Sequence, residues 1–255
     1  MKLKDKTVLI TGGGSGIGLE AVKQFLAQGA KVIITGRNQD KLDAAKRLHP
    51  SITAINSDVA NQDDAQALFA QVKAMGGIDI LYNNAGVVGK PLNLGSPSAK
   101  HLNDAQNEMN INYLAVIRLN NLFMDMLKAR AESAIINTTS ILSYQPINLA
   151  PTYSASKVAL RFYTDSLRQH LALIRSKVKV FELAPPAVAT DMADGIDAKI
   201  MSPEVLVAKL IAGLKADNYT IRVGDAKAIY YLSRFIPSLA YKLVNTAKNN
   251  STLTA

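Results

Sequence analysis

Short runs of apolar residues alternate with longer segments of helical periodicity along most of this chain. Runs that are rich in β-branched residues and lack polar alternation are typical of strands buried on both faces, as in parallel sheets. Helices between such strands form right-handed crossovers that cover both faces. The order predicts an α/β fold with a single doubly wound parallel sheet of about seven strands. The expected strands are Thr7–Thr11, Lys31–Thr35, Ile52–Asn56, Ile78–Tyr82, Ala134–Thr138, Val178–Leu183 and Tyr219–Val223.

The remaining segments fit one large domain, which we place at 1–255. Val87–His101 is rich in Gly, Pro, Ser and Asn, and Pro185–Ser202 begins with two prolines. Both follow strands at the edge where a parallel sheet binds ligands, so we expect both to form walls of a site. We expect 185–202 to be a substrate lid and 226–255 an amphipathic helical tail. The expected helices are Gly16–Gln28, Gln39–Leu48, Gln62–Met75, Asn103–Arg130, Tyr153–Ile174 and one that begins at Pro203.

The composition excludes several kinds of site. The chain has no cysteine, which removes disulfides, thiolate metal sites and cysteine nucleophiles. The three histidines, His49, His101 and His170, are far apart and lack ligand spacing, so we expect no metal. The first apolar run is too short for a secretory signal, and no segment is long enough to span a membrane. We therefore expect a cytoplasmic protein.

The charge balance is basic, with 29 Lys and Arg against 20 Asp and Glu and a net charge of +9. Basic side chains are scattered without a run or a nucleic-acid motif, so we expect no nucleic-acid partner. An anionic cofactor with an extra phosphate explains the charge better. From Ala226 onward, basic residues stand beside aromatic ones without an acid. Such a tail can lie on an anionic membrane, but packing on its own core or on a partner subunit is favoured.

The first expected strand runs directly into TGGGSGIG, residues Thr11–Gly18, which opens the first expected helix. Glycines let the backbone turn tightly and approach a pyrophosphate, whose charge the helix N-terminus stabilises. An ordinary turn is the alternative, but the position between the first strand and helix favours dinucleotide binding in a Rossmann-like fold. The candidate cofactor residues here are Gly12, Gly14, Ser15, Gly16, Ile17 and Gly18.

The end of the second expected strand indicates which dinucleotide is bound. NAD enzymes place an acidic residue about 20 positions beyond the glycine loop, whereas an arginine there accommodates a 2′-phosphate. Arg37 lies 19 residues past Gly18 (37 − 18), while Asp40 and Asp43 fall inside the following helix. Because a guanidinium fork suits a phosphate, we expect NADP rather than NAD. The alternative is that Arg37 is an ordinary surface residue.

Three motifs in order give a specific resemblance. TGGGSGIG, then Asn83–Gly86 (NNAG), then Tyr153–Lys157 (YSASK) is similar to the short-chain dehydrogenase/reductase family, and the resemblance covers Lys6 to about Val223. It implies hydride transfer between a nicotinamide and the carbonyl or secondary alcohol of a small-molecule substrate. We also expect a homodimer or a homotetramer.

Tyr153 and Lys157 are four residues apart, so on a helix they share one face. A tyrosine has a reference pKa near 10 and is a poor base at neutral pH. A nearby ammonium favours the phenolate and draws the pKa of Tyr153 toward the working range. The resemblance gives Tyr153 the role of proton carrier and lets Lys157 also hold the nicotinamide ribose.

Two further candidates stand before this pair. Ser140 follows the fifth expected strand, and its hydroxyl can polarise a substrate carbonyl. The resemblance assigns the catalytic serine to Ser140, with Ser143 as the nearby competitor. It also matches Asn112 to a helix asparagine that holds a water connecting Lys157 to solvent, with Asn110 as the alternative.

The resemblance implies further cofactor contacts. Asp58 and Val59, at the end of the third expected strand, resemble an adenine-contacting pair, and residues of the NNAG motif would line the floor beneath the ribose. Pro186 replaces the glycine that the family usually has after the sixth strand. The resemblance therefore does not fix how Val188 and Thr190 contact the nicotinamide carboxamide. The remaining candidates are Asn83, Asn84, Ala85, Gly86, Pro185, Val188 and Thr190.

Three other functions compete with a reductase. Epimerases and dehydratases use the same Tyr/Lys pair but typically carry an added substrate domain, for which this chain has no room. A non-redox protein, such as a hydrolase or a cofactor sensor, can use the same scaffold. A peripheral membrane protein built around the basic tail is the third alternative.

Overall fold

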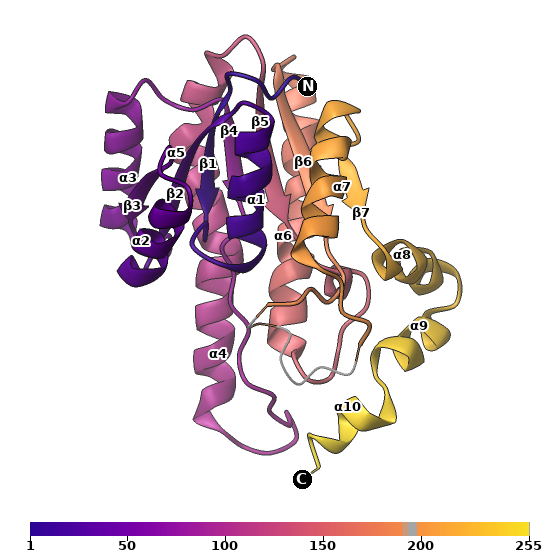
Figure 1. Cartoon of the computed structure of the whole chain (residues 1–255). Coiled ribbons are helices and arrows are strands. Elements are labelled where there is room, and N and C mark those ends of the chain that lie inside the picture. Colours follow the sequence, from indigo (N-terminus) through magenta and orange to yellow (C-terminus); the bar gives the residue numbers. More distant parts are fainter. Residues whose placement is uncertain (191, 193–197, 255) are drawn as a thin grey trace.

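Seven parallel strands form one sheet in the computed structural model, which describes residues 1–190, 192 and 198–254 (Figure 1). The strand order is β3-β2-β1-β4-β5-β6-β7, which confirms the predicted doubly wound, Rossmann-like sheet. The order reverses between β1 and β4, and ligands bind at the carboxyl ends of strands beside such a reversal. The strands are β1 (Thr7–Thr11), β2 (Lys31–Gly36), β3 (Thr53–Asn56), β4 (Ile80–Asn83), β5 (Ser133–Thr138), β6 (Val178–Ala184) and β7 (Thr220–Arg222).

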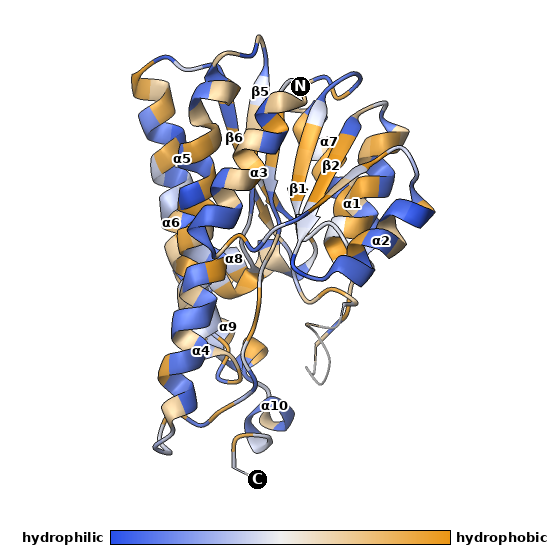
Figure 2. Ribbon diagram, turned by 90° about the vertical axis from the view of Figure 1, so that its left-hand side faces the viewer, coloured by the Kyte–Doolittle hydropathy of each residue, from blue (hydrophilic) through white to orange (hydrophobic). Residues whose placement is uncertain are grey.

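Two hydrophobic cores hold helices against the two faces of the sheet. Because successive strand side chains point to opposite faces, Val8 and Ile10 join one core and Leu9 joins the other. Side chains of α1, α2 and α7 complete the first core, and those of α3, α5 and α6 complete the second. In Figure 2 the polar residues of these helices alternate with apolar ones. The helices that cover the sheet are α1 (Gly16–Ala27), α2 (Gln39–Leu48), α3 (Gln62–Ala74), α5 (Ala115–Lys128), α6 (Pro151–Leu173) and α7 (Pro203–Lys215).

The predicted long helix over roughly Asn103–Arg130 begins earlier, at Ala99, and contains a turn that the sequence did not predict. The structure has α4 (Ala99–Met109), a π-helical turn over Asn110–Leu114 and then α5. In this turn the backbone N–H of Ala115 donates to the carbonyl of Asn110, one residue further back than in an α-helix. The apolar periodicity continues through such a turn, so the sequence did not reveal it. The wide turn brings the side chain of Asn112 into the protein interior.

The irregular segment expected over Val87–His101 ends three residues early, because α4 begins at Ala99. The hydroxyl of Ser98 accepts a hydrogen bond from the backbone N–H of Lys100 and so caps the helix. Bounds of the other expected strands and helices agree with the structure to within about two residues.

The loop between β1 and α1 depends on glycine at two kinds of position. Gly12 and Gly16 have φ angles of +66° and +53°, in the left-handed region that other residues rarely adopt. Gly18 instead packs so tightly on the loop that an added Cβ would overlap the carbonyl oxygen of Gly12. The first turn of α1 is thereby pressed against the end of β1.

The C-terminal helices pack on the loop that follows β5. The backbone N–H of Asn148 donates to Oδ1 of Asn245 (2.6 Å), and its Nδ2 donates to Oδ1 of Asn250 (3.0 Å). Asn148 Oδ1 accepts from the Tyr241 hydroxyl (3.0 Å), and Asn245 Nδ2 donates to the Pro146 carbonyl (3.0 Å). These four hydrogen bonds, the asparagine tether, join the tail to the body of the protein. The tail helices are α8 (Asp225–Phe235), α9 (Pro237–Val244) and α10 (Ala247–Ser251).

No helix among the described residues is both long and apolar enough to cross a bilayer.

Substituting Gly18→Ala should destabilise the protein by roughly 1–3 kcal/mol, because the new methyl group overpacks the loop. Urea denaturation measures the free energy of unfolding. The matched control is Gly36→Ala, whose Cβ would meet only Leu42 at an ordinary 3.7 Å. We expect the control to change the free energy by less than about 0.5 kcal/mol. Equal effects of the two substitutions would contradict the packing at Gly18.

Candidate active site

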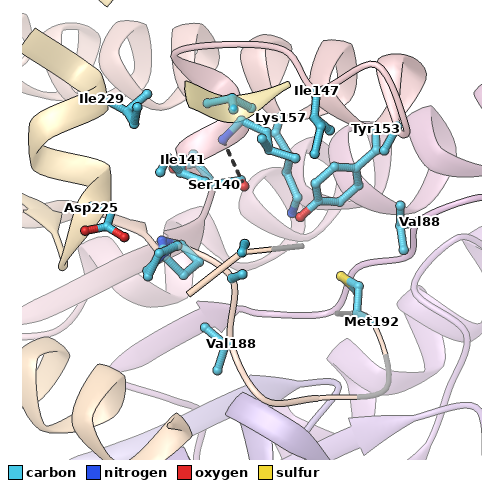
Figure 3. Close-up of a pocket in the computed structure, with 18 of the residues that line it drawn as sticks. Val88, Ser140, Ile141, Ile147, Tyr153, Lys157, Val188, Met192, Asp225 and Ile229 are labelled. Carbon is cyan, nitrogen blue, oxygen red and sulfur yellow. Dashed lines mark hydrogen bonds between the residues drawn. The ribbon is translucent and has the colours of Figure 1, made fainter. Parts of the chain in front are cut away.

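A cavity of about 440 Å³ opens at the carboxyl ends of the central strands (Figure 3). Ser140, Tyr153 and Lys157 all line it, although they come from the end of β5 and from α6. Its volume lies within the range of small-molecule sites. The structure therefore brings the three predicted catalytic side chains to one cavity.

Tyr153 and Lys157 project from successive turns of α6. Lys157 is only 3% exposed, and its ammonium donates to the carbonyl oxygen of Thr138 at 2.9 Å. The same nitrogen lies 5.6 Å from the centre of the Tyr153 ring. Gly86 lies beside it, because a Cβ added there would be 3.5 Å from the ammonium nitrogen. The lysine thus connects α6, the end of β5 and the NNAG segment.

The surroundings move the pKa values of both side chains. The pKa of Tyr153 is raised to about 12, mainly by burial; the Ser140 side chain opposes this rise and the charge of Glu108 adds to it. Burial alone lowers the pKa of Lys157 to about 8. Without a bound cofactor, the phenol is therefore strongly held in its protonated form.

Ser140 and its competitor Ser143 have different surroundings. The Ser140 oxygen accepts from the backbone N–H of Leu142 at 3.1 Å and lines the cavity. The Ser143 hydroxyl donates to the Ser140 carbonyl at 2.6 Å and is buried outside the cavity lining. Thr139 donates to the carboxylate of Glu182 at 2.7 Å. Of the two serines, only Ser140 presents its hydroxyl to the cavity.

Asn112 is fully buried, whereas its alternative Asn110 is exposed. The Asn112 amide donates to the Val87 carbonyl (2.9 Å) and the Ser156 hydroxyl (3.0 Å), and its oxygen accepts from the Val87 N–H (2.9 Å). An asparagine with these partners fastens the segment after the NNAG motif to α6. Its expected role as a water-holding residue stays a prediction.

The glycine loop and the NNAG segment are held together by one threonine. The Thr11 hydroxyl accepts from the backbone N–H groups of Asn84 and Ala85, both at 3.0 Å. Asn84 Nδ2 donates back to the Thr11 carbonyl at 3.0 Å. An added Cβ on Gly12 would lie 3.1 Å from Ala85 Cα, so the two segments touch. The contact fixes the glycine loop in place, and its glycines leave the backbone uncovered by side chains. This is the open backbone cradle that a pyrophosphate requires.

The segment after β6 lies across from this cradle. The methyl group of Thr190 would be 3.0 Å from a Cβ on Gly16, and Pro185, Val188 and Thr190 all line the cavity. The carbonyl of Pro185 accepts from the N–H of Ile141, which ties the serine loop to β6. Residues 191 and 193–197 of the expected lid lie outside the described residues.

Arg37 stands at the end of β2, where it is exposed and lies 3.8 Å from a carboxylate oxygen of Asp58. Asp58 also accepts from the N–H of Ala60, and the Val59 carbonyl accepts from Arg118. The described cavity does not extend to Arg37, Asp58 or Val59. They lie further along the same edge of the sheet, on the β2–β3 side.

The expected cofactor residues therefore divide into two groups. Those that line the cavity are Ile17, Asn84, Gly86, Tyr153, Lys157, Pro185, Val188 and Thr190. Those that lie outside its lining are Gly12, Gly14, Ser15, Gly16, Gly18, Arg37, Asp58, Val59, Asn83 and Ala85. An extended dinucleotide along the carboxyl edge would contact both groups, with its nicotinamide end in the cavity.

Two buried carboxylates were not expected from the sequence. Glu108 on α4 accepts from the Gly89 N–H at 2.7 Å, and its other oxygen has no partner among the described residues. Glu182 on β6 accepts from Thr139 and from the Tyr144 hydroxyl (3.3 Å). Burial raises the pKa of Glu182 above its usual value. Glu182 interrupts the apolar run of β6, and this could have predicted a buried polar network, since a buried charge requires partners.

His49, His101 and His170 do not meet, and no group of three or more potential ligands among the described residues could hold a metal ion.

Comparison with known proteins decides the family. A model of the family described as short chain dehydrogenase matches residues 6–200, more than half of the chain. This chain belongs to the short-chain dehydrogenase/reductase family. An uncharacterized oxidoreductase, DltE of Bacillus subtilis, is 32% identical over 98% of this chain and 100% of the relative. A 3alpha-hydroxysteroid dehydrogenase of Mediterraneibacter gnavus is 31% identical over 93% of this chain and 92% of its own.

The fold is shared with solved members of the family. The crystal structure of a short chain dehydrogenase from Burkholderia cenocepacia in complex with NADP has a TM-score of 0.83 and 24% identity, and covers 94% of this chain and 97% of its own. Solved structures of this fold hold either NADP or NAD. The short-chain dehydrogenase described here is an NAD(P)-dependent oxidoreductase that acts on hydroxyl or carbonyl groups.

Substituting Glu108→Gln should lower the pKa of Tyr153, because it removes the negative charge that disfavours the phenolate. Glutamine keeps an oxygen to accept from the Gly89 N–H. We expect the rising limb of the pH profile of alcohol oxidation to move to lower pH. The measurement is kcat/KM against pH, with Asp125→Asn as the control, because the Asp125 side chain on α5 is 99% exposed. A profile unchanged in Glu108→Gln, or moved equally in both variants, contradicts this role of Glu108.

Proposed function

We propose that this short-chain dehydrogenase transfers a hydride between NADP(H) and the carbonyl or secondary alcohol of a small molecule, with Tyr153 as the general acid and base. One observation carries the proposal. Ser140, Tyr153 and Lys157 line one cavity, and the ammonium nitrogen of Lys157 lies 5.6 Å from the centre of the Tyr153 ring. Bound NADPH supplies the hydride.

In the direction of reduction, the hydroxyl groups of Ser140 and Tyr153 donate to the substrate carbonyl oxygen. Because the Ser140 oxygen already accepts from the Leu142 N–H, its own proton is free to point at the substrate. As hydride reaches the carbonyl carbon, the C=O double bond becomes single and the oxygen takes the proton of Tyr153. Tyr153 is left as a phenolate, which a proton from solvent restores. In oxidation the phenolate takes the alcohol proton.

Lys157 makes this proton transfer accessible near neutral pH. Its ammonium is fixed by the Thr138 carbonyl beside the Tyr153 ring, so its positive charge stabilises the phenolate. The pKa of Lys157 is lowered to about 8 by burial, so this charge is present below pH 8 and is lost as the pH rises. The positively charged nicotinamide ring of bound, oxidised NADP would add a second charge that favours the phenolate.

The choice of NADP over NAD rests on Arg37. Its exposed guanidinium stands at the end of β2, beside the cradle rather than inside it. The first turn of α2 approaches the same cradle, since a Cβ on Gly14 would lie 3.2 Å from Cβ of Lys41. Two basic residues at this corner favour a cofactor with a 2′-phosphate.

The cytoplasmic location and the homodimer or homotetramer expected from the sequence stay predictions.

Substituting Tyr153→Phe should lower kcat by roughly 100-fold or more, because the proton carrier is removed while the ring remains. The Kd of NADPH should stay within about twofold. Stopped-flow NADPH oxidation and fluorescence titration measure the two quantities. Tyr231→Phe, on the exposed side of α8, is the control and should leave both unchanged. Normal turnover by Tyr153→Phe would show that another group moves the proton.

Substituting Arg37→Asp should raise the Kd of NADPH by roughly 10- to 100-fold, because a charge-assisted hydrogen bond to phosphate is replaced by repulsion. The Kd of NADH should change little. Titration of both cofactors gives the ratio of the two Kd values, with Arg47→Asp, an exposed residue of α2, as the control. A parallel loss of both affinities in Arg37→Asp would remove the argument for NADP.

A further inference from the structure

The part of the cavity beyond Ser140 and Tyr153 is walled by aliphatic side chains from two distant segments. One segment is the loop that follows β5, and the other is the tail. Figure 3 places Ile141 and Ile229 on the side of the cavity away from Tyr153. The side chains that form this wall include Ile141, Ile147 and Leu149 from the loop and Ile229, Leu232 and Leu243 from the tail.

Charged groups are sparse in this wall. Besides Lys157, the charged side chains among the described lining residues are Lys199 and Asp225. Both are exposed, and they have opposite signs, so neither provides a buried counter-ion. The ammonium of Lys157 is already bonded to the Thr138 carbonyl. A charged substrate group placed against the aliphatic wall would lose water without gaining a buried counter-ion among the described residues.

We propose that the substrate is an uncharged ketone, or the corresponding secondary alcohol, whose hydrocarbon part lies against the tail. This inference rests on the proposed function and names its substrate class. Each methylene group buried against an aliphatic wall strengthens binding by about fourfold. A carboxylate in the same place weakens binding by roughly 100-fold or more, because its desolvation is uncompensated.

The asparagine tether holds this wall in position. Asn245 is 7% exposed, and its side chain bonds both the Asn148 N–H and the Pro146 carbonyl. These two residues belong to the loop that carries Ile147 and Leu149. Both halves of the wall are therefore fixed to each other by Asn245, at a distance from the cofactor residues.

A series of methyl ketones with ethyl, butyl and hexyl chains tests the inference, with NADPH and NADH each supplied in excess. The matched probe is the keto acid in which a carboxylate replaces the terminal methyl group of the hexyl chain. We expect kcat/KM to rise by about fourfold per methylene and the keto acid to fall at least roughly 100-fold below its hexyl counterpart. A flat series, or a keto acid as good as the hexyl ketone, overturns the inference.

Variants locate the selecting wall. Leu232→Trp should fill the tail side of the cavity and lower the hexyl-to-ethyl ratio of kcat/KM by about fivefold or more. The control Leu173→Trp, on the exposed end of α6, should leave the ratio unchanged. Asn245→Ala should raise the KM of the hexyl ketone while the Kd of NADPH stays unchanged. An unchanged hexyl-to-ethyl ratio in Leu232→Trp together with an unchanged KM of the hexyl ketone in Asn245→Ala would place the substrate elsewhere.

The same panel separates this inference from the proposed function. If the keto acid is the only probe that the enzyme reduces with NADPH, the proposed reductase function is supported and the apolar substrate class is wrong. If none of the probes is reduced with either cofactor, ketone binding to Tyr153→Phe with bound NADPH is measured by calorimetry. Tighter binding of the hexyl ketone than of the keto acid then supports the substrate class while the redox proposal fails. The reverse order, or no binding, rejects the substrate class too.

Discussion

Burying the ammonium of Lys157 costs free energy that its surroundings must offset. The carbonyl of Thr138 accepts its hydrogen bond, and the Tyr153 ring and Gly86 lie beside it. These groups come from β5, α6 and the NNAG segment, so the three elements must meet correctly before the charge is tolerated. The pKa of Lys157 lies below its usual value because the free-energy cost of burying its charge is only partly offset. The buried Tyr153–Lys157 pair therefore depends on the correct packing of these three elements.

Ser140 is fixed by a second network that extends toward the tail. Its neighbour Thr139 donates to buried Glu182, which also accepts from Tyr144. Arg222 donates to the Tyr144 hydroxyl and lies 3.7 Å from the ring centre of Tyr230 on α8. A guanidinium over an aromatic face stabilises such a contact by about 0.5–2 kcal/mol. The loop that carries Ser140 and the tail helices are therefore connected by one continuous set of side-chain contacts.

The sequence predicted the sheet, the glycine loop and the Tyr153–Lys157 pair, because each depends on spacing within one or two neighbouring elements. It did not predict the π-helical turn at Asn110–Leu114, since the apolar pattern passes through that turn unchanged. Glu108 was also missed, because its burial and its hydrogen bond from Gly89, 19 residues earlier, depend on how α4 packs and not on a local pattern. For the tail, the sequence favours amphipathic helices that pack on the core or on a partner subunit, but it does not indicate which surface they cover. Which surface its apolar face would cover depended on hydrogen bonds to Asn148, about a hundred residues earlier in the chain.

The asparagine tether has a consequence for how the protein matures. Asn148 and its partners Asn245 and Asn250 are 97 and 102 residues apart, so this closure is among the long-range contacts that form late. On the ribosome the sheet through β7 emerges before the tail does, and domains generally assemble from the N-terminal end. A nascent chain can therefore complete its dinucleotide cradle while one wall of the neighbouring cavity is still missing. The wall that the tail contributes to the cavity forms only after the tail helices have been synthesised.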